Sequence, residues 1–306
     1  MTTRVQLLKE YQELNESSHS TVDGPVSPLE FMRMVHTSRP VLFQNCPLPL
    51  RQEWTDEYLA TTVGEIDVSV TPDGRADALV DIDDKTYFAE PLVERMSMKD
   101  FLTRLDSNDH TNEILYLQSQ NDNLDYGSRS DTGDFARIRT DIPPDIHWAS
   151  AALGRQPDAV NIWIGSDKSV TSVHSDPYEN VYAVIRGAKI FTLFPPTEGW
   201  CLQEREYPHA RWIRDSSGQL CLKPTADQTV RWSSIRDPTD PPPLTRPVTV
   251  LVRRGEMLYL PAGWWHYVQQ VSNRTIAVNY WYDLEYQGHN WLFLSYLRSL
   301  GLSDEK

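Results

Sequence analysis

Three residues in the second half of the chain have side chains suited to holding one metal ion together. His174 and Asp176 are separated by a single residue, and His266 ends the stretch YLPAGWWH, residues 259–266. On an extended strand, residues i and i+2 project from the same face, so we expect His174 and Asp176 to converge on one point. Two imidazoles and one carboxylate leave the other coordination positions open, as non-haem Fe(II) oxygenases require.

A cation follows this segment at a spacing that returns it to the same region. Lys189 begins an apolar run, residues 189–194, that only Gly187 and Ala188 separate from the run 181–186. Two runs with so short a connection predict a hairpin, which carries Lys189 back beside His174. A lysine that points inward from such a strand needs an anionic partner, and a dicarboxylate co-substrate would supply one.

The motifs around these residues resemble the JmjC family of 2-oxoglutarate- and Fe(II)-dependent oxygenases, and most closely its small JmjC-only hydroxylases, which include a lysyl hydroxylase. The resemblance covers most of the chain. It is carried together by TPDGRADA (71–78), LYLQ (115–118), PDAVNIWIG (157–165), HSDPYENVY (174–182), GEMLYLPAGWWH (255–266) and AVNYWYD (277–283).

The resemblance implies the reaction, the cofactors and the role of each site residue. Fe(II) is bound by His174, Asp176 and His266, and 2-oxoglutarate and O2 are the co-substrates. The remaining positions bind 2-oxoglutarate: Lys189, with Thr171 and Tyr116, at its distal carboxylate, Asn180 and Asn279 at its chelating end, and Trp281 as a wall of the pocket.

A lysine side chain in an intracellular protein is the substrate that resemblance and charge favour. The formal net charge of −14 and the pI of about 5 favour a basic partner and disfavour nucleic acid as a direct ligand. The candidate partners of the substrate ammonium are Glu179, Asp122 and Asp125, the last two in an acid-rich loop over residues 122–134.

Three other functions remain open at this stage. Removal of a methyl group from N-methyl-lysine would use the same fold and cofactors. A metal-dependent peptidase or other hydrolase is a second alternative, because a His2Asp site with an open position can also activate water. A non-catalytic binding protein of cupin fold is the third.

The chain has the composition of a soluble globular protein. Its three cysteines, Cys46, Cys201 and Cys221, are odd in number and lack C-x-x-C spacing, which argues against a disulfide framework and a structural zinc site. We find no apolar run suited to a signal peptide or a membrane span. These features predict a cytoplasmic protein without membrane contact, and a nuclear pool remains open.

The pattern of apolar residues predicts an α+β fold. From residue 114 onward short apolar strands follow one another without intervening helices, which favours a two-sheet β architecture; the resemblance implies the double-stranded β-helix, or jelly roll, of cupins. We expect helices over residues 4–15, from Ser27, over 54–63 and over 97–105.

We divide the chain into three parts on this pattern. Residues 1–110 are expected to form N-terminal helices and strands packed on the core, and residues 111–285 the JmjC β-helix, with an insertion at about 197–247. Residues 286–306 are expected to form a C-terminal helix, whose apolar face either docks on the sheet or pairs with a second subunit as a homodimer.

Overall fold

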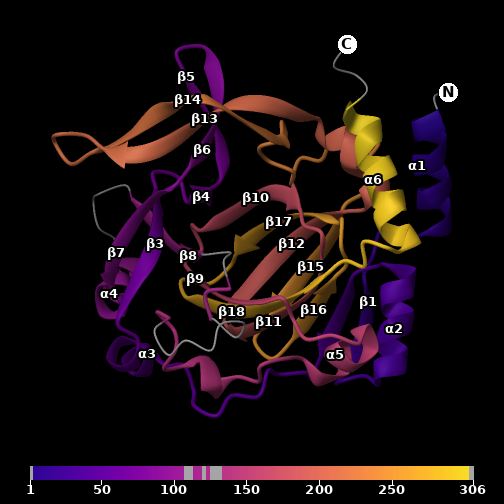
Figure 1. Cartoon of the computed structure of the whole chain (residues 1–306), viewed down its shortest axis with the longest axis horizontal. Helices are drawn as coiled ribbons and strands as arrows, with labels where there is room; N and C mark the ends of the chain where they lie inside the picture. The colour runs from indigo at the N-terminus through magenta and orange to yellow at the C-terminus, as the bar shows by residue number, and fades with distance from the viewer. Residues whose placement is uncertain (1–2, 107–112, 119–121, 125–132, 303–306) are drawn as a thin grey trace.

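The computed structural model describes residues 3–106, 113–118, 122–124 and 133–302. Most of its strands belong to two sheets. The larger has the order β1-β2-β16-β11-β18-β9-β8-β3-β7, and the second has the order β15-β12-β17-β10-β4. Figure 1 shows these strands at the centre of the molecule. The strands of the larger sheet are β1 (Ser20–Asp23), β2 (Val41–Gln44), β3 (Glu65–Thr71), β7 (Leu92–Ser97), β8 (Ile114–Gln118), β9 (Ala159–Gly165), β11 (Tyr178–Arg186), β16 (Met257–Leu260) and β18 (Thr275–Asp283).

The second sheet packs against the larger one through a buried apolar layer. Its strands are β4 (Arg75–Ala76), β10 (Val170–Ser175), β12 (Ala188–Phe194), β15 (Val248–Arg253) and β17 (Trp265–Gln270). Val184 of β11 and Leu258 of β16 belong to the same buried cluster as Phe191 of β12 and Val250 of β15. Alternate residues of facing strands therefore fill the space between two sheets, as in a jelly roll. The α+β fold with a cupin-like β core is confirmed.

Helices cover the outer face of the larger sheet. They are α2 (Pro28–Thr37), α3 (Asp56–Thr62), α4 (Met98–Asp106) and α5 (His147–Leu153). Phe31 of α2 and Trp148 of α5 pack edge to face, with ring centroids 4.7 Å apart, in the cluster that includes Tyr259 of β16. The capping box expected at Ser27 is present, because its side chain accepts from the backbone N–H of Glu30 and the Glu30 carboxylate accepts from the backbone N–H of Ser27.

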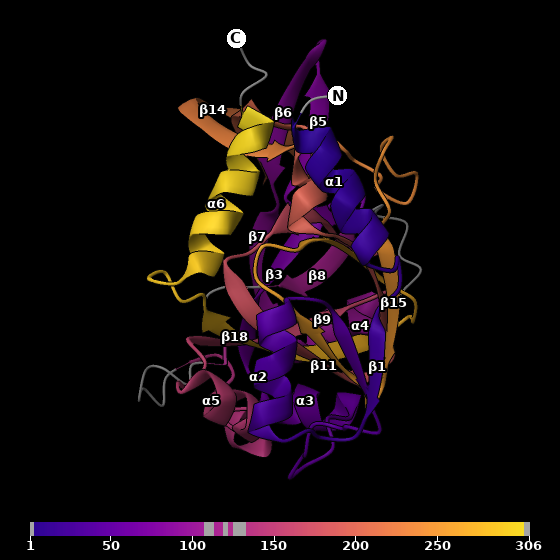
Figure 2. The ribbon, with the colours of Figure 1, turned by 90° about the vertical axis from the view of Figure 1, so that its right-hand side faces the viewer.

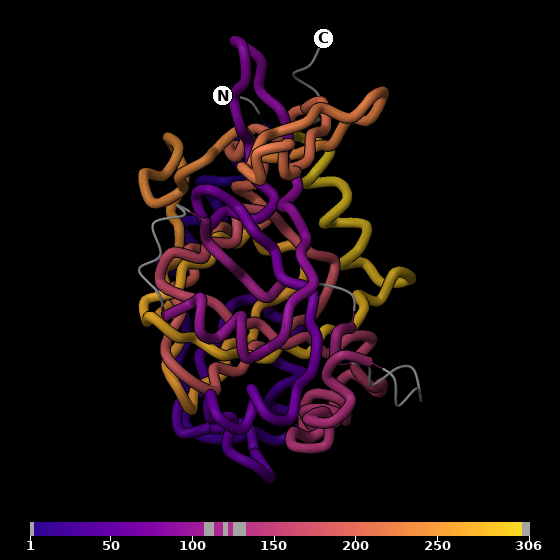
Figure 3. Tube along the Cα trace, turned by 90° about the vertical axis from the view of Figure 1, so that its left-hand side faces the viewer, coloured from indigo at the N-terminus to yellow at the C-terminus, as the bar shows by residue number. Residues whose placement is uncertain are grey.

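Residues 196–233 build structure where the sequence predicted an insertion. A 3₁₀ helix, η2 (Pro196–Leu202), leads into two long strands, β13 (Glu204–Arg214) and β14 (Leu220–Ser233). These pair with β5 (Ala78–Ile82) and β6 (Lys85–Glu90) in a third sheet of order β14-β13-β6-β5. Figure 3 shows both hairpins projecting from one end of the molecule. The division of the chain into three parts stays a prediction.

The first and last helices lie at that same end. α1 (Thr3–Leu14) and α6 (His289–Leu302) both contact η2, and Arg4 donates a hydrogen bond to the carbonyl of Leu300 at 3.2 Å (Figure 2). α6 docks through the buried Leu297 and leaves Trp291 half exposed. The homodimer stays a prediction. Among the described residues, no helix is both long enough and apolar enough to cross a membrane.

Candidate metal centre

The structure brings the three predicted metal ligands together. One ligand atom each from His174, Asp176 and His266 lies within 4.8 Å of the others. The Oδ2 atom of Asp176 is 3.6 Å from Nε2 of His174 and 3.6 Å from Nε2 of His266. Separations of this size suit three ligands about 2 Å from one ion. The donor set and its geometry therefore fit Fe(II).

The two histidines come from neighbouring strands. β10 and β17 run antiparallel, and His174 is the register partner of His266. The rings lie side by side, with centroids 4.3 Å apart. Asp176 follows the last residue of β10, Ser175, so it belongs to the connection to β11 and not to the strand on which the sequence placed it.

The three candidate ligands line one cavity, and a β-bulge in β10 decides which other residues of this strand face it. Thr171 and His174 are an odd number of residues apart, and on a regular strand they would point to opposite faces. The register between β10 and β17 shifts between these two residues, so that β10 carries one residue more than its partner. Both side chains consequently line the same cavity.

Hydrogen bonds to the backbone hold the imidazoles in place. Nδ1 of His174 lies 2.8 Å from the carbonyl of Ser172, and Nδ1 of His266 lies 3.1 Å from the carbonyl of Trp264. When each Nδ1–H donates to its carbonyl, each Nε2 keeps a lone pair directed toward Asp176. Outer hydrogen bonds of this kind fix the tautomer of metal-binding histidines.

The ionisation states of Asp176 and His266 also suit a cation. Burial raises the pKa of the Asp176 carboxyl, but the adjacent imidazoles outweigh burial and lower that pKa to about 2. Burial lowers the pKa of His266 to about 4. Metal ligands must be a deprotonated carboxylate and a neutral imidazole, and near pH 7 these two residues are already in those forms.

Lys189 is fully buried and faces no carboxylate among the described residues. Its Nζ donates to the phenol oxygens of Tyr182 at 2.8 Å and Tyr116 at 3.2 Å. It also lies 5.6 Å from the ring centroid of Trp163. Burial lowers the pKa of Lys189 to about 7. An ammonium group held only by neutral partners fits the carboxylate of a bound anion such as 2-oxoglutarate.

The other predicted co-substrate residues surround the same cavity. Asn279 accepts from Nε1 of Trp163 at 2.7 Å and donates to Oδ1 of Asn180 at 3.3 Å. Trp281 stacks on Tyr178, with ring centroids 4.7 Å apart and 5° between the ring planes, and its role as a wall of the co-substrate pocket stays a prediction. The predicted residues that line the cavity are Thr171, His174, Asp176, Asn180, His266, Asn279 and Trp281.

Two of the three candidate partners of a substrate lysine, Glu179 and Asp122, do not line this cavity. Glu179 is buried and its Oε2 accepts from the hydroxyl of Tyr259 at 2.6 Å, within the cluster on the outer face of the larger sheet. Its neighbour Asn180 points to the cavity, because successive strand residues face opposite ways. The hypothesis for Glu179 is therefore wrong. Asp122 accepts from the backbone N–H of Val160 at 2.8 Å, and Asp125 lies outside the described residues.

Sequence reasoning missed three aromatic residues of the site. Tyr182 and Trp163 line the cavity. Trp232 of β14 stacks on the imidazole of His174, with ring centroids 6.0 Å apart and 11° between the ring planes. Tyr182 could have been found, because it lies two residues beyond Asn180 on one strand. Trp232 had no such signal, since it comes from a region that read as an insertion.

Comparisons with known proteins agree with this geometry. Residues 27–288 match the cupin-like domain family. The human bifunctional peptidase and (3S)-lysyl hydroxylase JMJD7 is 37% identical over 87% of this chain and 84% of its own length. The Arabidopsis thaliana lysine-specific demethylase JMJ32 is 34% identical over 95% and 90%, and the Dictyostelium discoideum JmjC domain-containing protein E is 33% identical over 81% and 78%. The chain therefore belongs to the cupin-like JmjC-domain proteins.

Proposed function

We propose that this protein is a 2-oxoglutarate- and Fe(II)-dependent dioxygenase that hydroxylates a lysine side chain of another protein. In this reaction one atom of O2 enters a C–H bond of lysine as a hydroxyl group. The other atom enters succinate, which forms as 2-oxoglutarate loses CO2. Bound iron supplies the activation of O2, and the residues of the chain bind, orient and shield the reactants.

The observation that carries the proposal is the position of Lys189 relative to the three candidate ligands. Tyr182, which accepts a hydrogen bond from Lys189, lines the same cavity as His174 and His266. A dicarboxylate that binds Lys189 through one carboxylate would therefore direct its other end toward the metal ligands. A simple hydrolase has no use for a buried lysine at this place.

The surrounding residues would orient the co-substrate. Lys189 and the hydroxyls of Tyr116 and Thr171 are assigned to its distal carboxylate. Asn180 and Asn279, joined to each other by a hydrogen bond, are assigned to the chelating end. A charge-assisted hydrogen bond is roughly twice as strong as one between neutral groups, so Lys189 should dominate the affinity.

Lysine is proposed as the substrate on two grounds. The similar human protein is described as a lysyl hydroxylase. The acidic chain, with a net charge of −14, attracts basic partners by long-range electrostatics. Demethylation of methyl-lysine is the second candidate, because the similar Arabidopsis protein is described as a lysine-specific demethylase.

Peptides that carry an unmodified or a methylated central lysine separate these candidates. The protein is supplied with Fe(II), 2-oxoglutarate and O2, and the peptide products are analysed by mass spectrometry. Hydroxylation predicts a gain of one oxygen atom on unmodified lysine. Loss of methyl groups without any hydroxylysine would replace the proposal with demethylation. Peptide cleavage that needs no 2-oxoglutarate, with no oxygen added to lysine, would replace it with hydrolysis.

A further inference from the structure

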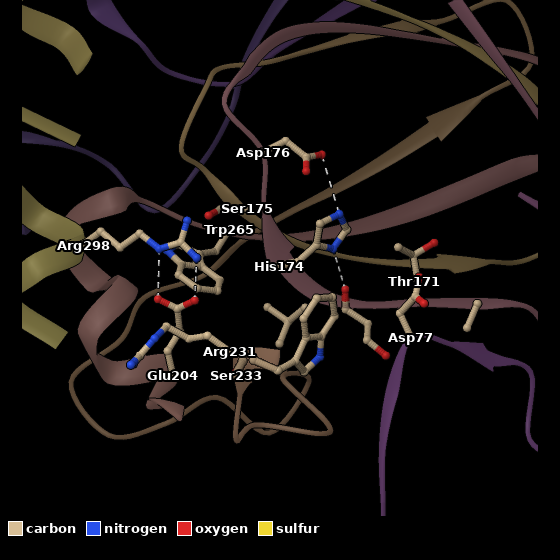
Figure 4. A pocket seen from close by; sticks show the side chains of 14 residues that line it. Asp77, Thr171, His174, Ser175, Asp176, Glu204, Arg231, Ser233, Trp265 and Arg298 are labelled. Carbon is tan, nitrogen blue, oxygen red and sulfur yellow. Dashed lines mark hydrogen bonds and ion pairs between the residues drawn. The ribbon is translucent and has the colours of Figure 1, made fainter. Parts of the chain in front are cut away.

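A second cavity adjoins the metal centre and holds a carboxylate that the proposed reaction has not used. Asp77 lines this cavity together with His174 and Asp176. It lies in the TPDGRADA motif, immediately after β4. In the view of Figure 4, Asp77 and Thr171 lie on one side of His174, and the pair Glu204 and Arg298 lies on the other.

Backbone pairing between β4 and β10 positions Asp77 at the wall of this cavity. β4 pairs with β10, so that Ala76 is the register partner of Thr171. The N–H of Val170 donates to the carbonyl of Gly74 at 2.9 Å. Asp77 itself has φ +60°, in the left-handed region that residues other than glycine rarely adopt. Aspartate and asparagine adopt this region more readily than most other side chains, so the turn is compatible with a carboxylate at the cavity wall.

Apart from the metal ligands, the other charged side chains in this cavity are already paired. Arg298 makes two hydrogen bonds to Glu204, at 2.7 and 3.1 Å, and Arg231 donates to Glu206 at 3.2 Å. Asp77 is in no ion pair with an arginine or lysine in the part of the chain that the structure describes; the imidazole of His174 and the side-chain amide of Gln118 are its polar neighbours. Among the described residues, the Asp77 carboxylate therefore lines the cavity without an arginine or lysine to neutralise it.

We propose that Asp77 binds the ε-ammonium group of the substrate lysine, an inference that rests on the proposed function. The ammonium would give Asp77 the buried counter-ion that the chain itself does not provide. Trp232 and Trp265 line the same cavity and would contact the methylene stem. A lysine whose ammonium group contacts Asp77 and whose methylene stem contacts the two tryptophans lies with its carbon atoms beside His174. Direct hydrogen bonds to a carboxylate also favour unmodified lysine over trimethyl-lysine, which has no N–H.

Binding of a small probe tests this assignment without turnover. The probe is Nα-acetyl-lysine amide, and Nα-acetyl-norleucine amide is its neutral counterpart of similar shape. The full-length protein is loaded with Mn(II) and 2-oxoglutarate, and the paramagnetic relaxation of the probe protons is measured by NMR. The wild-type protein is expected to relax the lysine probe at least about tenfold more than the norleucine probe, because a buried charge pair forms only with lysine.

Asp77→Asn keeps the shape of the side chain and tolerates a left-handed backbone, but it removes the charge. The preference for the lysine probe should then fall to less than about twofold, while both proteins still relax 2-oxoglutarate equally. Asp73→Asn is the matched control. Asp73 is exposed in the same motif and accepts a hydrogen bond from the N–H of Arg75, so this variant should keep the full preference.

An unchanged preference in Asp77→Asn would overturn the assignment. Loss of the 2-oxoglutarate signal in that variant would overturn it as well, because it would show that the carboxylate maintains the fold. The proposed function fails by a different result, namely a wild-type protein that binds the lysine probe selectively and yet adds no oxygen to any lysine peptide.

Discussion

His174 and His266 are register partners on two antiparallel strands, although one begins the motif HSDPYENVY and the other ends the distant motif GEMLYLPAGWWH. Their Nε2 atoms are each 3.6 Å from the same oxygen of Asp176. Strand pairing therefore sets the distance between two of the three ligands.

The affinity for 2-oxoglutarate should depend chiefly on Lys189. Lys189→Met removes the only cation proposed at the distal carboxylate, and we expect a loss on the order of 2–5 kcal/mol in binding free energy. Thr171→Val should cost about 0.5–1.5 kcal/mol, because it removes only a neutral hydrogen bond. Calorimetric titration of the Mn(II)-loaded proteins gives both values. Equal losses in the two variants would remove Lys189 from its proposed role.

Binding of 2-oxoglutarate should weaken as the pH rises above 7. Without a bound anion, burial lowers the pKa of Lys189 to about 7, so the amine loses its proton above that pH. A bound carboxylate favours the ammonium form, and binding must then take up a proton. The dissociation constant should increase by up to about tenfold per pH unit from pH 7 upward. Titrations in buffers of different ionisation enthalpy measure the proton uptake, and Lys189→Met should show none from this group.

The same burial predicts that Lys189→Met stabilises the protein without 2-oxoglutarate. The pKa of Lys189 is lower in the folded protein than in the unfolded chain, so between pH 7 and the ordinary lysine pKa the unfolded chain binds more protons. The stability cost of Lys189 is therefore greatest at or below pH 7 and declines as the pH rises. Urea denaturation near pH 7 should show a gain of about 1–3 kcal/mol. A loss of stability would show that the amine has an anionic partner in the fold.

Gly74→Ala should disturb the loop that places Asp77. Gly74 has φ +78°, and a Cβ atom there would lie 1.9 Å from the carbonyl oxygen of Lys168. We expect a loss of at least about 2 kcal/mol in the free energy of unfolding. Gly154→Ala is the control, because Gly154 has φ +68° and nothing within 4 Å of the added atom. It should cost roughly 1–2 kcal/mol, and equal effects of the two variants would refute the steric argument.

The sequence predicted the site best where strand alternation and motif agree. Lys189 was placed by a short hairpin, and the structure shows its side chain fully buried beside Tyr116 and Tyr182. Alternation also would have excluded Glu179, because its neighbour Asn180 faces the cavity. The bulge between Thr171 and His174 could not be predicted, since it depends on the register with β17.

The elements that were missed lack the sequence patterns that mark a strand or the start of a helix. β14, Leu220–Ser233, is half exposed along most of its length, so its sequence lacks the apolar alternation that marks a strand. α5, His147–Leu153, has no side-chain cap at its first turn. Asp77 was quoted in a motif but assigned no role, because an acidic residue near a turn is usually solvated. Its place beside the metal ligands is what supports the role proposed for it.

Labelling with oxygen-18 gas tests the central claim most directly. Lysine peptides are incubated with the protein, Fe(II) and 2-oxoglutarate, and the label is located by mass spectrometry. We predict one labelled oxygen on lysine for each succinate formed, none with Asp176→Ala, and an unchanged yield with the exposed control Asp240→Ala. Lysine that gains oxygen from water, or succinate formation that survives Asp176→Ala, would contradict the account.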